Sequence, residues 1–188
     1  MTAASIRTRE VILDAARAEF AEHGLAGGRV DRIAKAAGAN VQRIYAYYTD
    51  KAGLFQAVAT DAAEELVAAI GTEQRDIVDF AGTVFDYVTQ NPANTRVMTW
   101  ARLEREEEFF RMIHTGLSGA TPISAVAQLQ NTGRVTTRWD AGSILEAIIA
   151  LCERWHSTTS TAAPAEVTAH KELVLAFART LATEPATR

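Results

Sequence analysis

Hydrophobic residues recur at the spacing of an α-helix along nearly the whole chain. In the first such stretch the hydrophobic residues lie about one helical turn apart, with charged residues between them. They are Val11, Ile12, Ala15, Ala16 and Phe20. We expect this helix to end at Gly24, because glycine adopts the left-handed conformation that follows a helix without a steric penalty.

The same pattern predicts eight further helices, several with a typical first residue. Asn40 and Asp50 are candidate N-caps, and Thr121-Pro122 combines an N-cap with a proline at the first helical position. No run alternates hydrophobic and polar residues as a strand does, so the expected fold class is all-α with about nine helices. The further ranges are about 29–37, 41–48, 50–70, 77–88, 97–107, 121–130, 141–155 and 164–181.

Composition and the distribution of charge indicate where a polyanionic partner would bind. A chain of 188 residues with 48% hydrophobic residues is long enough to bury a core without disulfides or structural metals. Its net charge is −4, but residues 1–54 hold 8 Lys or Arg and 6 Asp or Glu, a net of +2, which leaves −6 for the remainder. A polyanion such as nucleic acid would therefore bind the amino-terminal part.

Two short predicted helices, at 29–37 and 41–48, have the dimensions of a helix-turn-helix. Gly38 supplies the sharp turn between them. In such a motif the first helix supports the second in a DNA major groove. The residues available for the small core between the two helices are Val30, Ile33 and Ile44.

The second of these helices carries side chains suited to both bases and phosphates. Gln42 can hydrogen-bond to adenine and Arg43 to guanine. Tyr45, Tyr47 and Lys51 suit phosphate oxygens, which fix the register of a protein on DNA. Both classes of contact are thus available within ten residues.

The stretch from Arg9 to Leu54 resembles the DNA-binding domain of the TetR (tetracycline repressor) family of bacterial transcriptional regulators. The motifs keep the family's order and spacing, with Ile44 in place of the usual Leu and Tyr48 in place of the usual Phe. They are Ile12-Leu13-Asp14-Ala15-Ala16, Phe20-Ala21-Glu22-His23-Gly24, Val30, Ile33-Ala34, Ala37-Gly38, Ile44-Tyr45, Tyr47-Tyr48, Lys51 and Leu54. The resemblance implies a DNA-binding domain in residues 1–54 and a helical regulatory and dimerisation domain in residues 55–188.

The same resemblance implies a ligand-responsive transcriptional regulator that binds double-stranded DNA. The first reading is a repressor that binds a palindromic operator as a homodimer and is released by a small-molecule effector. The sequence does not distinguish a repressor from an activator. It also does not identify the effector, the operator sequence or the regulated genes.

Two positions depart from the family pattern. Gly27-Gly28 stand where the family usually has Thr or Ser at the start of the second helix, so we expect Arg29 to supply the phosphate contact. Arg43 replaces a residue that is usually small, which indicates a different base preference. The full set of expected DNA-binding residues is Arg29, Asn40, Val41, Gln42, Arg43, Tyr45, Tyr47 and Lys51.

The carboxy-terminal part offers candidates for an effector pocket and a dimer interface. Aromatic and sulfur-containing side chains are typical of apolar pockets, and the candidates are Phe85, Met98, Trp100, Phe110, His114, Cys152 and Trp155. The predicted helix at 144–155 is hydrophobic on more than one face, which with the last helix favours an isologous four-helix interface. Its expected residues are Ile144, Ile148, Leu151, Val174, Phe177 and Leu181.

Other patterns favour less specific interpretations. Glu153 and His156 have the Glu-x-x-His spacing of di-iron bundles, but no second such motif occurs, so we expect no metal and no cofactor. Cys152 lies within an apolar helix, which predicts an inert thiol. The acidic run is interpreted as a solvated helix face, and it consists of Glu104, Glu106, Glu107 and Glu108.

The sequence shows neither a glycine-rich phosphate loop nor a nucleophile elbow, so we expect no enzyme. The alternative that stays open is a helical-bundle enzyme or small-molecule carrier with a vestigial helix-turn-helix. The chain contains no signal peptide and no hydrophobic run long enough to span a bilayer, so we expect a cytoplasmic protein without a membrane partner.

Overall fold

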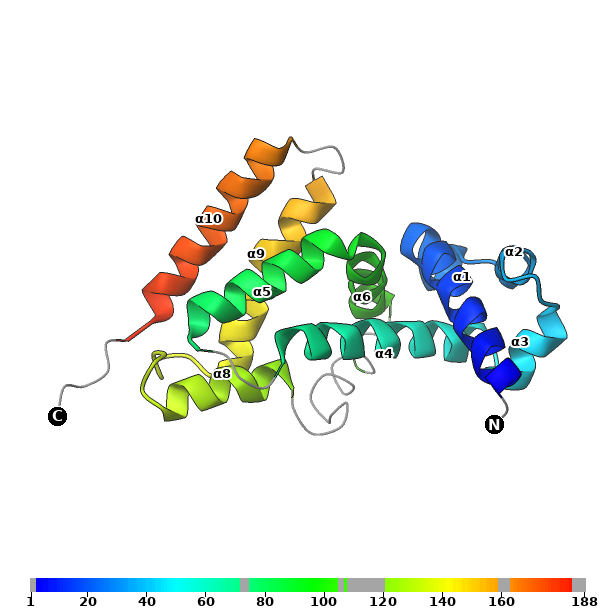
Figure 1. Ribbon diagram of the computed structural model, residues 1–188, viewed down its shortest axis with the longest axis horizontal. Helices are drawn as coiled ribbons and strands as arrows, with labels where there is room; N and C mark the ends of the chain where they lie inside the picture. The colour runs from blue at the N-terminus through cyan, green and yellow to red at the C-terminus, as the bar shows by residue number, and fades with distance from the viewer. Residues whose placement is uncertain (1–2, 72–74, 105–106, 108–120, 159–162, 184–188) are drawn as a thin grey trace. The chain divides into compact units, whose positions relative to one another are not determined.

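The computed structural model describes residues 3–71, 75–104, 107, 121–158 and 163–183. Over these residues the protein consists of nine helices joined by turns, which confirms the all-α prediction (Figure 1). None of the described helices combines the length and the apolar character needed to cross a membrane.

The first three helices begin and end at the residues that local chemistry favours. Helix α1 spans Ala3–Gly27 and contains a break at Gly24, whose φ of 65° is the left-handed conformation predicted there. Helices α2 and α3 span Val30–Ala36 and Val41–Tyr47. Asn40 caps α3 as predicted, because its side chain accepts a hydrogen bond of 2.7 Å from the backbone N–H of Arg43.

The remaining helices follow the predicted order, with one shifted start. Thr121 caps α8 through a capping box with Ser124, as its sequence indicates. Helix α6 begins at Pro92 instead of Val97, because proline fits the first turn of a helix. The bounds are α4 Lys51–Ile70, α5 Ile77–Gln90, α6 Pro92–Glu104, α8 Pro122–Asn131, α9 Ala141–Thr158 and α10 Pro164–Leu181.

The helices form two compact units, and the first is discontinuous in sequence. It contains α1, α2, α3, α4 as far as Glu64, and α6. Helix α6 contributes Val97 and Ala101 to its core, and Trp100 packs against the same core. The other buried residues of this core include Ile12, Phe20, Ile33, Ile44, Leu54, Phe55 and Val58.

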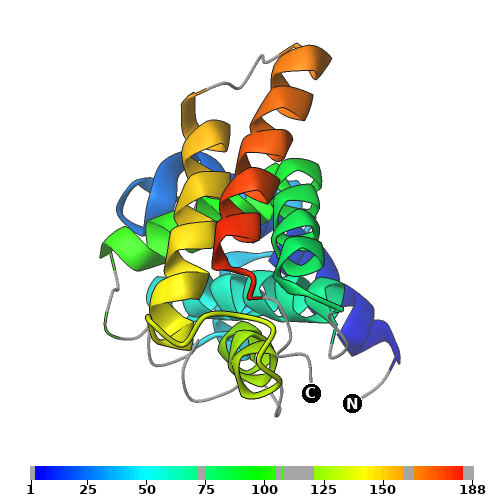
Figure 2. The same cartoon turned by 90° about the vertical axis from the view of Figure 1, so that its left-hand side faces the viewer.

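The second unit contains the end of α4, α5, α8, α9 and α10. Helix α10 lies alongside α5 and α9, and α8 packs against α9 (Figure 2). The core between them is hydrophobic and fully buried at Phe80, Val84, Ile148 and Val174. An antiparallel bridge between Val135 and Ala182 joins the residue after α10 to the loop before α9.

Candidate nucleic-acid interface

The turn between α2 and α3 is set by backbone hydrogen bonds around Gly38. Gly38 has a φ of 61°, and the N–H of Ala39 donates to the carbonyl of Ala34 over 3.0 Å. A residue with a Cβ is disfavoured in this conformation, which explains the glycine at the turn. The connection between the two helices is therefore the short glycine-containing turn that the helix-turn-helix prediction requires.

Helix α3 buries one narrow face and exposes the rest. Ile44 is fully buried against the first unit's core, together with Val30 and Ile33 of α2. Tyr48, at the end of α3, is also buried. A helix of seven residues held by one buried stripe presents its other side chains to solvent.

Several of the residues predicted to bind DNA are exposed on α3 or just before it. Gln42 and Arg43 are exposed, and Tyr45 is 43% exposed. Asn40 is exposed but uses its side-chain oxygen to cap the helix. Val41 is half-buried, so only part of its surface is available to a ligand.

Tyr47 is held by a residue that the sequence did not indicate. Its hydroxyl lies 3.1 Å from Oγ of Ser5, in the first turn of α1. The hydrogen bond to Ser5, and then the nearby Arg43, lower the pKa of Tyr47 below its ordinary value. The pKa of the neighbouring Tyr48 is shifted in the opposite direction, because burial of its side chain raises it.

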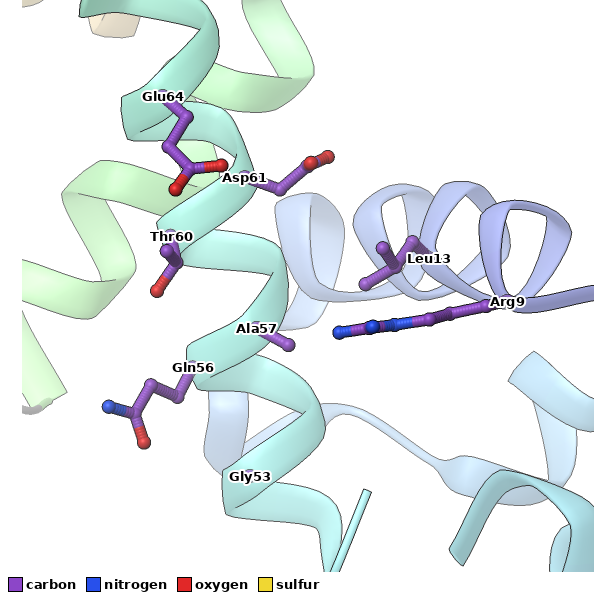
Figure 3. A pocket seen from close by; sticks show the side chains of 8 residues that line it. All are labelled: Arg9, Leu13, Gly53, Gln56, Ala57, Thr60, Asp61 and Glu64. Carbon is purple, nitrogen blue, oxygen red and sulfur yellow. The ribbon is translucent and has the colours of Figure 1, made fainter. Parts of the chain in front are cut away.

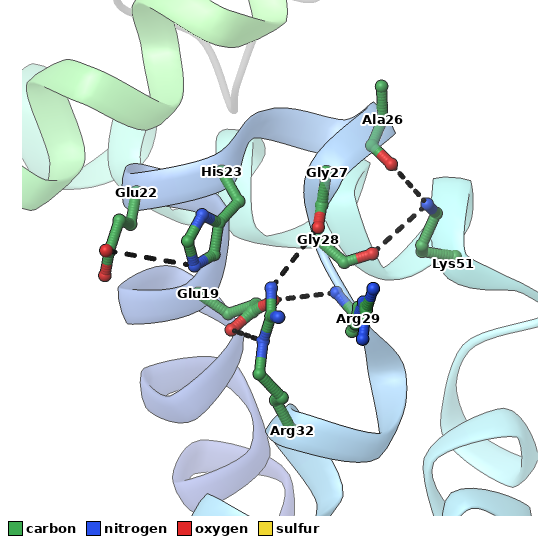
Figure 4. Close-up of polar contacts among 9 residues, drawn as sticks. All are labelled: Glu19, Glu22, His23, Ala26, Gly27, Gly28, Arg29, Arg32 and Lys51. Atoms are coloured by element: carbon green, nitrogen blue, oxygen red, sulfur yellow. Dashed lines mark hydrogen bonds and ion pairs between the residues drawn. The ribbon is translucent and has the colours of Figure 1, made fainter.

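Lys51 binds the protein's own backbone. Its Nζ donates to the carbonyl oxygens of Ala26, at 3.3 Å, and of Gly28, at 3.2 Å (Figure 4). Ala26 lies in the last residues of α1, after the break at Gly24, and Gly28 lies in the connection to α2. The phosphate contact predicted for Lys51 therefore competes with a structural role that two hydrogen bonds already define.

The start of α2 is organised by the carboxylate of Glu19 (Figure 4). This carboxylate accepts a 2.7 Å hydrogen bond from the backbone N–H of Arg29 and two of 2.9 Å from Nε of Arg32. The hydrogen bond from Arg32 lowers the pKa of Glu19. Arg29 thus uses its backbone to fix α2, while the residue is exposed and its side chain carries the positive charge predicted to contact phosphate.

The glycine at position 28, where the family usually has a hydroxyl residue nearby, has a packing reason. A Cβ at Gly28 would lie 2.6 Å from two ring carbons of Phe20, closer than any side chain tolerates. Phe20 is fully buried, and its ring meets that of Phe55 edge to face with centroids 5.1 Å apart. The glycine therefore allows α2 to start close to the aromatic core.

An open groove of about 370 Å³ runs between α1 and α4 (Figure 3). Arg9 reaches into it from α1, and its Nε donates to the hydroxyl of Tyr48 over 3.3 Å. None of the predicted effector-pocket residues lines this groove. Its lining consists of Arg9, Leu13, Gly53, Gln56, Ala57, Thr60, Asp61 and Glu64.

The predicted effector-pocket residues are divided between the two units. Phe85 and Cys152 are buried in the second unit, and burial raises the pKa of the Cys152 thiol to about 12. Met98 is buried and Trp100 half-buried in the first unit, where the ring of Trp100 lies against Gly24. Phe110, His114 and the side chain of Trp155 lie outside the described part of the chain.

The predicted dimer residues differ in how far they are buried within the single chain. Leu151 and Phe177 are half-buried, and the other four are buried in the core of the subunit. Packing within the subunit therefore accounts for part of the apolar pattern of α9 and α10. These four are Ile144, Ile148, Val174 and Leu181.

Comparison with known proteins places both units in one family. Residues 12–58 match the family model described as bacterial regulatory proteins, tetR family. Residues 76–188 match the model described as tetracyclin repressor-like, C-terminal domain. The chain is 35% identical over 151 residues to the helix-turn-helix-type transcriptional repressor SCO4008 of Streptomyces coelicolor. The aligned region covers 77% of this chain and 76% of that protein.

Solved structures show the same architecture. A transcriptional regulator from Streptomyces coelicolor, SCO4942, superposes with a TM-score of 0.74 at 30% identity, covering 95% of this chain and 99% of that one. A TetR-family regulator from Rhodococcus superposes with a TM-score of 0.71 at 18% identity, covering 94% and 98%, which shows the shared fold. These matches are regulators, and they do not support the alternative of a helical enzyme or carrier.

Proposed function

Because the chain belongs to the TetR family of bacterial transcriptional regulators, we propose that it is a repressor that binds a palindromic operator as a dimer. A small molecule bound by the carboxy-terminal helices releases it from the DNA. The observation that carries this proposal is the exposure of Gln42, Arg43 and Tyr45 on a helix fixed by the buried Ile44. DNA binding places the protein in the cytoplasm, with the chromosome.

Base recognition is assigned to two side chains of α3. The guanidinium of Arg43 donates to O6 and N7 of guanine, and the amide of Gln42 pairs with N6 and N7 of adenine. Both residues are exposed in the first turn of α3, whose N-cap is Asn40. The first turn of a recognition helix is the part that contacts base edges in the major groove.

Phosphate contacts are assigned to residues at both ends of the motif. Arg29 lies immediately before α2, and Tyr45 and Tyr47 lie in the last turns of α3. A guanidinium and two hydroxyls at these places set the register of α3 on the duplex without selecting a base. Lys51 supports this arrangement indirectly, since its Nζ holds the turn before α2.

Dimerisation is assigned to the outer face of α10, with the adjacent surface of α9. Leu173 is 55% exposed, and Ala169 and Ala176 are exposed at positions four before it and three after it. Residues at these spacings share one helix face. Small side chains around one large apolar residue suit the close antiparallel approach of two copies of α10 about a twofold axis.

Effector binding is assigned to the apolar interior of the carboxy-terminal helices. Phe85 and Cys152 are buried there, and side chains of this kind line sites for apolar small molecules. Release from DNA follows if the effector binds more tightly to a conformation in which the two recognition helices no longer match the operator spacing. An effector with equal affinity for both conformations would change nothing.

Selection of duplexes from a random-sequence library tests the proposal directly. The expected product is a sequence with twofold symmetry that binds far more tightly than random DNA. Arg43→Ala should then lose preference at one position in each half-site, whereas the charge-matched control Arg138→Ala in the second unit should keep it. A selected sequence without symmetry, or no selected sequence, would contradict the proposal.

A further inference from the structure

The break in α1 leaves backbone N–H groups that need new partners. After Gly24, with a φ of 65° and a ψ of −173°, the chain starts a separate turn. The N–H groups of Leu25 and Ala26 each donate to the side chain of Glu104, to Oε1 and Oε2 respectively, at 3.0 Å. One carboxylate at the end of α6 therefore receives two consecutive N–H groups of α1, 79 and 78 positions away in the chain.

The contact is close as well as polar. A Cβ at Gly24 would lie 2.9 Å from two ring carbons of Trp100 and would also collide with the carboxylate of Glu104. Gly24 is thus required twice, by its positive φ and by the approach of α6. The end of α6 therefore lies in direct contact with this turn.

The same turn is held from its other side by a cation. Lys51, at the start of α4, donates to the carbonyls of Ala26 and Gly28, while Glu104 accepts from the N–H groups. Ala26 takes part in both interactions. Residues 25–28, which connect the break in α1 to the start of α2, are therefore clamped by a carboxylate from α6 and an ammonium group from α4.

We infer that Glu104 is a positioning residue for DNA binding, although it lies outside the helix-turn-helix. The clamped turn leads directly into α2, and α2 packs against α3. The orientation of α3 relative to α1 therefore depends on the hydrogen bonds that the last turn of α6 makes. A shift of that turn breaks both bonds together, because one carboxylate makes them.

Glu104 acts through geometry and charge, which separates it from a packing residue. A glutamine at this position has nearly the same shape, but its amide NH₂ faces a backbone N–H and cannot accept from it. An aspartate retains the charge but is one methylene shorter. Hydrogen bonds to a charged acceptor are stronger than those between neutral groups, so glutamine weakens the clamp by removing the charge. Aspartate weakens it through its length, because a shorter side chain no longer brings both oxygens to the two N–H groups.

The experiment compares Glu104→Gln and Glu104→Asp with the wild-type full chain. The control is Glu107→Gln, which removes an exposed carboxylate from the same acidic run. We expect both Glu104 variants to lose about tenfold in affinity for the selected duplex, the factor of one charge-assisted hydrogen bond. Amide hydrogen exchange at Leu25 and Ala26 should accelerate in the same variants, with the core amides of Ile12 and Phe20 unchanged.

Binding is measured below the unfolding transition of each variant, so loss of the folded state does not imitate loss of positioning. If Glu104→Gln bound the selected duplex with wild-type affinity, or if amide exchange at Leu25 and Ala26 were unchanged, the inference would be overturned. The proposed function would be unaffected by either result. The inference rests on the proposed DNA binding. A wild-type protein that selects no duplex would overturn the proposed function and this inference together, and the exchange experiment distinguishes the two failures because it needs no DNA.

Discussion

The hydroxyl groups of Ser5 and Tyr47 lie 3.1 Å apart, which joins the beginning of α1 to the last turn of the recognition helix. The bond places a hydroxyl from α1 beside the surface that would meet DNA. It also means that Tyr47 is oriented before any duplex binds. Ser5 is therefore part of the candidate interface, although it lies 42 positions away from Tyr47 in the chain.

Ser5→Ala should raise the pKa of Tyr47 toward the ordinary value of about 10, because the hydrogen bond between the two hydroxyl groups is the main cause of its lowering. The measurement is a titration of ring-labelled tyrosine signals by NMR, with Tyr47→Phe to identify the signal. The buried Tyr48 serves as an internal control, since its pKa is raised by burial and should stay where it is. An unchanged Tyr47 signal would mean that the hydroxyl contact is absent in solution.

Lys51→Met should weaken DNA binding mainly through the protein's own structure. The variant keeps the length of the side chain but loses hydrogen bonds to the carbonyls of Ala26 and Gly28. We expect the free energy of unfolding to fall by about 1 to 2 kcal/mol, measured by urea denaturation.

The salt dependence of binding separates this role from a phosphate contact. Losing one phosphate contact changes the slope of log K against log salt by about 0.9. Arg29→Ala should show this change, whereas Lys51→Met should leave the slope nearly unaltered. If Lys51→Met changed the slope of log K against log salt by the same amount, Lys51 would be a phosphate-binding residue.

Glu19→Gln should destabilise the protein at neutral pH and not in acid. Arg32 lowers the pKa of Glu19 in the folded state, so the carboxylate stabilises the protein fully above about pH 4.3, where a free glutamate titrates, and loses this effect as the pH falls further. Because Arg32 is 44% exposed, the expected cost is only about 1 kcal/mol.

The measurement for Glu19 is urea denaturation of both proteins between neutral pH and strong acid. The two stabilities should converge as Glu19 of the wild type becomes protonated. The exposed Glu10, also on α1, supplies the matched control, and Glu10→Gln should show no such convergence. A Glu19→Gln difference that is the same at every pH would refute the assignment of the ion pair.

Cys152 should resist alkylation in the folded protein. The residue is 1% exposed and burial raises the pKa of its thiol to about 12, so almost no reactive thiolate exists at neutral pH. Iodoacetamide should label the protein several orders of magnitude faster in urea than in buffer. Rapid labelling of the native protein would show that α9 opens more readily than its burial indicates.

Local chemistry made much of the fold predictable. Gly24, Asn40 and Thr121 act within three or four residues of their own position, so the left-handed break, the N-cap and the capping box could be read from neighbouring residues. The exposed residues of α3 followed from the same logic. A seven-residue helix with one buried isoleucine leaves few positions for its exposed face.

The contacts between distant segments could not be predicted in this way. Glu104 belongs to an acidic run that resembled a solvated helix face, and nothing near it in sequence indicates the N–H groups of Leu25 and Ala26. The apolar pattern of α9 was equally consistent with a dimer interface and with a buried core. The hydrophobic periodicity of a helix indicates how much of its surface is buried, but it does not indicate which segment packs against that surface.

The participation of α6 in the first unit affects how such regulators could be recombined. Val97 and Ala101 close a core whose other members all come from residues 12–59. A gene fusion that transfers only the first sixty residues to a new sensor would leave part of that core exposed to water. An intact DNA-reading module from this protein therefore has to be transplanted as two separate segments, or onto a host whose own sixth helix presents the same apolar surface.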